Sequence, residues 1–198
     1  MRKKILVGCA AFFLMICSAG ISALAHSGGT TFNNYGSEST GWVIRTTHHN
    51  ANRSLTYKYD SADACMSTTL YRNMTANGAA KWAPCGTISY NSTSNNTITT
   101  INDKNAGFTA QTGNYAYNTS TLHTSRYTIT INRYHHSSGS DYDTAVVSHE
   151  FGHAFGLLHV LEDRNKNAIM YGNGVINATA RRPATKDANG LSNIANGN

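Results

Sequence analysis

The sequence predicts one α+β domain behind a short export signal. Runs of β-branched residues separated by Asn, Ser and Gly predict the strands of a sheet. Residues 62–82 form a helix candidate, and residues 144–155 carry Ala, Val and Phe at helical spacing. About 170 residues remain after the signal, which suits a single domain with its own core.

The first 25 residues have the composition of a signal peptide. Residues 2–4 are basic, residues 5–21 are apolar, and Ala-Leu-Ala at residues 23–25 offers a cleavage site. The apolar run is short for a membrane span, and polar residues follow it at once. A lipid anchor at Cys9 is the disfavoured alternative, because the apolar segment follows that cysteine. We therefore expect a secreted chain that starts near His26 and has no transmembrane anchor.

The mature chain is only mildly basic. Its formal charge falls from +6 to +3 when Arg2, Lys3 and Lys4 leave with the signal. Such a small excess does not indicate nucleic-acid binding. We expect a monomer that acts on protein or peptide substrates and binds no nucleic acid.

Two cysteines, Cys65 and Cys85, remain in the mature chain. An even pair in an exported protein predicts one disulfide, with two free thiols as the alternative. Closing a loop of about 20 residues in this way would stabilise the fold by about 3 kcal/mol.

The elements are predicted in the following order. Residues 26–41 are rich in Gly, Ser, Thr and Asn and predict a flexible leader that proteolysis can remove. The domain proper covers residues 42–198. Strands are expected at 42–47, 55–59, 87–90, 97–101 and 128–131. Helices are expected at 62–82, with an interruption near Asn77-Gly78, and at 144–155 and 184–194.

The most informative segment is His-Glu-Phe-Gly-His-Ala-Phe-Gly-Leu-Leu-His at residues 149–159. His149 and His153 are four residues apart, so a helix presents them on one face. Gly156 can adopt positive φ, end the helix and return His159 as a third ligand. The alternative, core histidines on an amphipathic helix, fits a lone histidine better than this spacing.

The segment predicts a catalytic zinc site. Three neutral imidazoles leave Zn²⁺ one open position, as a catalytic site requires. Glu150 lies next to the first ligand and is the candidate general base for a zinc-activated water.

With Met170, this pattern resembles the metzincin zinc endopeptidases, and most closely the matrixin catalytic domain. Residues 55–59 resemble the first strand of that family, residues 128–132 its last strand, and Ala-Ile-Met-Tyr at 168–171 its Met-turn. The resemblance implies a zincin fold: a mixed, mostly parallel twisted sheet, a long first helix, an active-site helix and a C-terminal helix after the Met-turn.

The resemblance also implies one catalytic zinc per chain, held by His149, His153 and His159, with Met170 as an apolar floor. Val160 stands where matrixins usually have a small hydroxylated residue, which leaves the subfamily open. Substrate preference is expected to depend on residues 172–183.

Other candidate ligands carry weaker signals. Tyr171 could assist a reaction intermediate, but packing is the favoured interpretation. Asp163-x-Asn165-x-Asn167 resembles the start of a calcium loop, but it lacks the glycine and the distal glutamate, so calcium has no clear motif. Five further histidines show no ligand spacing: His48, His49, His123, His135 and His136.

The sequence thus predicts a secreted zinc endopeptidase with Glu150 as general base. Two alternatives remain: a surface-binding protein that keeps the zinc fold without turnover, and a hydrolase that acts on cell-wall amides.

Overall fold

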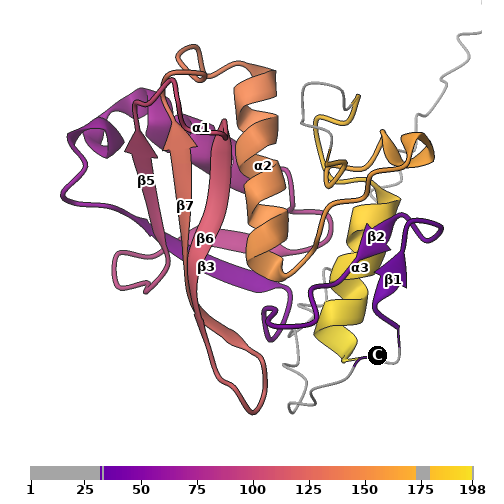
Figure 1. Cartoon of the computed structure of the whole chain (residues 1–198). Coiled ribbons are helices and arrows are strands. Elements are labelled where there is room, and N and C mark those ends of the chain that lie inside the picture. The colour runs from indigo at the N-terminus through magenta and orange to yellow at the C-terminus, as the bar shows by residue number, and fades with distance from the viewer. Residues whose placement is uncertain (1–31, 33, 173–178, 198) are drawn as a thin grey trace, which may run out of the picture.

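A computed structural model describes residue 32, residues 34–172 and residues 179–197. The predicted signal peptide at residues 1–25 and residues 26–31 of the predicted leader lie outside the described residues, as do residues 173–178 of the predicted specificity loop. Three helices and a five-stranded sheet make up most of the described chain (Figure 1). Within this part, no helix combines the length and the apolar character needed to cross a bilayer.

The sheet is mixed and mostly parallel, as predicted. Its strands are β3 (Ser54–Tyr59), β4 (Thr87–Tyr90), β5 (Thr97–Ile101), β6 (Ala110–Tyr117) and β7 (Thr124–Asn132). They lie in the order β4-β3-β5-β7-β6, and β6 alone runs antiparallel to its neighbour. β6 is therefore an edge strand.

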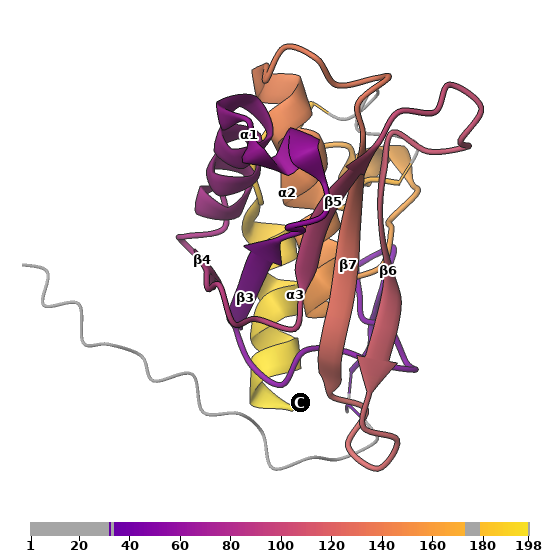
Figure 2. The same ribbon diagram turned by 90° about the vertical axis from the view of Figure 1, so that its left-hand side faces the viewer.

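The two faces of the sheet differ because side chains alternate along each strand. One face carries apolar side chains such as Tyr57, Ile98 and Ile129, which are buried in the core. The other face carries threonines such as Thr56, Thr97 and Thr128 at the alternating positions. Figure 2 shows the sheet nearest the viewer, with α2 and α3 behind it. One covered face and one open face explain the apolar–polar alternation.

The first helix is shorter than predicted. A 3-10 turn, η1 (Ala64–Ser67), precedes α1 (Thr69–Ala80). The two are separate because Thr68 is extended, with ψ at 146°. The expected interruption at Gly78 is also wrong: a Cβ there would lie 3.0 Å from the Cβ of Val147, so glycine lets α1 pack closely against α2 (Asp141–Phe155).

The remaining elements complete a second layer beside α2. The C-terminal helix α3 (Thr185–Asn196) lies beside the antiparallel pair β1 (Gly36–Ser37) and β2 (Trp42–Val43) (Figure 1). A short 3-10 turn, η2 (Asp163–Asn165), follows the third histidine. Since β1 belongs to the stretch predicted as a flexible leader, residues 34–41 are packed instead of loose.

The physical reason lies in Glu38 of that stretch. Its carboxylate accepts hydrogen bonds from the backbone N–H groups of Leu161 (2.6 Å) and Glu162 (3.1 Å) and from the side chain of Asn165 (2.9 Å). Burial raises the pKa of Glu38, but these hydrogen bonds outweigh it and leave the pKa below its ordinary value. The N-terminal segment is thus joined to the loop after the third histidine.

The predicted strands 87–90 and 97–101 match β4 and β5, and residues 55–59 match all but the first residue of β3. β7 extends the prediction at both ends, whereas β2 covers only two of the residues predicted at 42–47. β6 was missed, because its sequence AQTGNYAY lacks a β-branched run and contains Asn114 at φ 51° and a bulge.

The predicted disulfide is wrong: Cys65 and Cys85 are both free thiols. Cys65 lies before α1 and Cys85 after it, and 12 helical residues extend about 18 Å. A disulfide requires Cα atoms about 5.5–6 Å apart. The Cys85 thiol instead donates to the carbonyl of Trp82 (3.3 Å), and burial raises its pKa to about 11.

Candidate metal centre and active site

Helix α2 has well-defined ends. The Ser140 hydroxyl accepts from the N–H of Asp143 (3.1 Å), and the Asp143 carboxylate accepts from the N–H of Ser140 (3.2 Å), which forms a capping box. Burial raises the pKa of Asp143, but hydrogen bonds from His136, Ser138 and Ser140 outweigh it and lower the pKa below 3.8. At the other end Gly156 adopts φ 112° and turns the chain.

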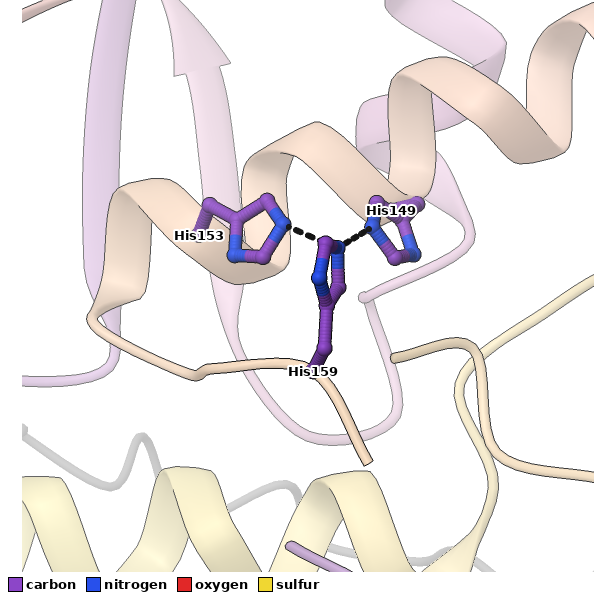
Figure 3. Close-up of side chains that lie close together, drawn as sticks. All are labelled: His149, His153 and His159. Carbon is purple, nitrogen blue, oxygen red and sulfur yellow. Dashed lines mark hydrogen bonds between the residues drawn. The ribbon is translucent and has the colours of Figure 1, made fainter. Parts of the chain in front are cut away.

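The turn at Gly156 returns His159 to the helix. Figure 3 shows His149 and His153 on α2, with their rings directed at the ring of His159. The Nε2 atoms of His149 and His153 each lie 3.0 Å from Nε2 of His159. The three predicted ligands therefore converge on one point.

Backbone carbonyls determine the tautomers of two of these rings. Nδ1 of His149 lies 2.6 Å from the carbonyl oxygen of Ile169, and Nδ1 of His153 lies 2.8 Å from that of Leu157. A carbonyl only accepts, so each Nδ1 carries the hydrogen and each Nε2 of a neutral ring presents a lone pair. Burial, the largest cause in each case, lowers the pKa of His149, His153 and His159, the last to about 4. The neutral form is the form that binds metal.

The donor set fits a tetrahedral zinc ion. His159 Nε2 can donate at most one hydrogen, so at least one of the two 3.0 Å contacts joins two lone pairs. A cation between the nitrogens removes that repulsion. Zn–N bonds of about 2.0–2.1 Å in tetrahedral geometry require N···N separations of about 3.3 Å, close to the observed ones. All three nitrogens lie within 4.8 Å of one another.

Glu150 lies beside this cluster and is buried, with 6% of its surface exposed. Its Oε2 accepts a hydrogen bond from the Thr112 hydroxyl at 2.7 Å. Burial raises the pKa of Glu150 to about 7, and the hydrogen bonds from Thr112 oppose that rise. A carboxyl that titrates near neutrality is suited to take up a proton and return it.

A cavity of about 750 Å³ opens over these residues. Residues 106–112, which lead into β6, line one wall, while His149, Glu150 and His153 line the helix side. Arg45, Lys104 and His135 also contribute to the lining. Within the described residues, the outer edge of β6 pairs with no other strand.

Met170, the predicted Met-turn residue, packs against α2 at Gly152, next to His153 in the chain. It is buried, and its sulfur lies against Gly152 of α2 with no room for a Cβ between them. Gly172 lies against the ring of His159. A side chain at residue 172 would overlap that ring.

Sequence reasoning missed Asp187, which supports this turn from α3. Its carboxylate accepts hydrogen bonds from the backbone N–H groups of Ile169 (3.0 Å), Met170 (3.2 Å) and Ala184 (2.8 Å). An Asp three residues after Ala184, the first residue of the predicted helix 184–194, was the available signal. Thr112 and Tyr115 were also missed, because both lie on the unpredicted strand β6.

Tyr171 does not face the cavity. It is buried, and its hydroxyl donates to Oδ1 of Asp163 (2.9 Å). The Asn165 side chain donates to Glu38. Asn167 accepts from the Thr179 hydroxyl (2.6 Å), so all three polar residues of the calcium-like stretch make side-chain hydrogen bonds within the protein.

Of the other histidines, His135 lines the same cavity, and the rest contact other side chains. The His48 ring stacks on Tyr117, the rings of His49 and His123 are 5.3 Å apart, and His136 contacts Asp143 at 2.8 Å. Within the described chain, no second set of three His, Cys, Asp or Glu side chains converges.

Comparisons with known proteins support the fold and do not identify a function. No protein-family model matches the chain, and no curated protein matches it in sequence. A similar solved structure is described as the GM1 bound form of the ECX AB5 holotoxin, with 14% identity and a TM-score of 0.54. The match covers 82% of this chain and 91% of that one. At this identity, the likeness supports a shared architecture and carries no function.

Proposed function

We propose that the chain is an exported zinc-dependent endopeptidase with a metzincin-like catalytic domain of the matrixin type. One observation carries the proposal. Three neutral imidazoles direct their Nε2 atoms at one point, and the buried Glu150 carboxyl lies beside them in an open cavity. The buried Met170 under the helix supports the metzincin assignment.

A zinc ion held by His149, His153 and His159 supplies Lewis acidity toward water and toward the scissile carbonyl. Glu150 accepts the proton of the attacking water and then delivers it to the leaving amine. The Thr112 hydroxyl orients Glu150 through its 2.7 Å hydrogen bond. Burial raises the pKa of this carboxyl, which favours its uptake of the proton before the proton passes to the leaving amine.

The substrate is an extended peptide bound along the unpaired edge of β6. Edge strands bind peptides by adding a strand, so backbone hydrogen bonds give affinity and side-chain pockets give selectivity. The cavity of about 750 Å³ lies directly beside this edge. This arrangement suits a protein substrate better than a small molecule.

The test is Glu150→Gln, measured as casein cleavage together with the zinc content of purified protein. Loss of a general base predicts a fall of about 10²–10⁴-fold in kcat with one zinc still bound. Glu162→Gln is the matched control, because that glutamate is exposed and pairs with Arg164, and its activity should equal wild type.

Undiminished cleavage by Glu150→Gln would contradict the proposed role. Stoichiometric zinc without cleavage of any peptide library by the wild type would favour the surface-binding alternative. Digestion of purified cell wall without casein cleavage would favour the cell-wall hydrolase.

A further inference from the structure

Arg45 is a charged residue of the cavity to which the catalytic proposal gives no role. Its backbone N–H donates to the carbonyl of Gly156 at 2.7 Å. Its guanidinium carbon lies 5.0 Å from the ring centroid of Tyr115. The Tyr115 hydroxyl donates to the carbonyl of His153 at 3.2 Å. These contacts hold Arg45 at the C-terminal end of α2, next to the second predicted zinc ligand.

The charges around the cavity are unbalanced at this end. Arg45 and Lys104 line the cavity, whereas its carboxylate, Glu150, is buried and hydrogen-bonded to Thr112. Within the described residues, Lys81 and Arg164 pair with carboxylates, whereas Arg45 forms no ion pair.

The Nε atom of Arg45 also lacks an acceptor within the described residues, although solvent does not reach it. Arginine keeps its proton at all ordinary pH values. Solvent does not reach this one nitrogen, but the rest of the half-buried guanidinium lines the cavity, where its charge favours pairing with an anion. Lys104 is exposed, so water solvates its charge.

We propose that Arg45 is a specificity-determining residue that binds the side-chain carboxylate of an acidic substrate residue, Asp or Glu. The proposal rests on the endopeptidase function above. The planar guanidinium suits a carboxylate because it offers two parallel N–H donors. It lies over a tyrosine ring, which keeps the guanidinium plane in place.

The structure also gives the position of this acidic residue in the peptide. Thr112 contacts Glu150 and Tyr115 contacts Arg45. The two points are therefore separated by three residues of β6 that include its bulge, which is less than the about 10 Å of a regular strand. A peptide antiparallel to β6, the commoner arrangement of paired strands, runs with its N-terminal residues toward Tyr115. The acidic residue therefore lies about three positions before the cleaved bond.

The experiment compares two peptides that differ only by Asp or Asn at that position. Because Arg45 is only half-buried, the hydrogen-bonded charge pair should make wild type cleave the Asp peptide about tenfold faster in kcat/KM. Arg45→Gln should remove the preference, and Arg45→Glu should transfer it to a Lys peptide. Arg126→Gln changes the same charge on an exposed residue that does not line the cavity and should keep the preference.

A second readout does not require turnover. Zinc-loaded Glu150→Gln should bind a fluorescent Asp peptide about tenfold more tightly than the Asn peptide, and adding Arg45→Gln should abolish the difference. Equal cleavage and binding of the two peptides by an active wild type, or a preference that survives Arg45→Gln, would overturn the acidic subsite and leave the endopeptidase intact. Absence of any proteolysis would instead overturn the proposed function.

Discussion

Removing the Asp187 carboxylate should weaken both the fold and the metal site, although Asp187 contacts none of the three histidines directly. It accepts hydrogen bonds from Ile169 and Met170, and the carbonyl of Ile169 accepts from Nδ1 of His149. Asp187→Ala therefore removes the support of the turn that orients the first ligand.

The size of the destabilisation in Asp187→Ala follows from the hydrogen bonds that are lost. Asp187 is fully buried, and three backbone N–H groups, those of Ile169, Met170 and Ala184, lose their acceptor. Each unpaired buried donor costs about 1–3 kcal/mol. Because a small cavity admits water and relaxes part of the cost, we expect a loss of about 3–5 kcal/mol in the free energy of unfolding. Disturbed orientation of His149 should lower zinc affinity by about 10–100-fold.

The assay is urea unfolding with and without zinc, combined with zinc competition against a chelating dye. Asp187→Asn should lower the free energy of unfolding by less, about 2 kcal/mol, because it keeps one acceptor oxygen. Asn193→Ala on the same helix, whose side chain donates only to the carbonyl of Asn189, is the control. An Asp187→Ala protein with wild-type unfolding energy and wild-type zinc affinity would refute the reasoning.

Three further predictions concern the helix ends and the cysteines. Gly156→Ala should cost at least about 2 kcal/mol in urea unfolding, because φ is 112° and its Cβ would lie 2.6 Å from that of His49. Folding lowers the pKa of Asp143, so its contribution to stability is present above the unfolded pKa and is lost as pH falls through the folded pKa, below 3.8. Asp143→Asn should therefore show a smaller loss of unfolding free energy in acid, measured by urea unfolding at a series of pH values. Without reductant, iodoacetamide should alkylate both Cys65 and Cys85 after unfolding, and mass spectrometry showing no addition would contradict free thiols.

The ligand cluster could be predicted because its geometry is local. His149 and His153 share a helix face by spacing alone, and Gly156 permits the turn that returns His159. β4 and β5 were predicted for the same reason, since each is a short β-branched run between turn residues.

The supporting groups could not be predicted because they come from distant segments. Thr112 reaches Glu150 from β6, a strand whose Gly and Asn residues conceal the usual alternation. Asp187 reaches the Met-turn from α3. The disulfide prediction failed similarly: sequence spacing does not reveal that α1 keeps Cys65 and Cys85 apart.

The metal site is oriented mainly by backbone groups. Carbonyls of Leu157 and Ile169 select the tautomers of His153 and His149, and neither hydrogen bond uses the side chain at residue 157 or 169. Those carbonyls are positioned by the turn at Gly156 and by the Asp187 carboxylate. Substitutions at 157 and 169 that preserve core volume should therefore leave the ligand geometry intact, whereas Gly156 and Asp187 cannot change without moving a carbonyl.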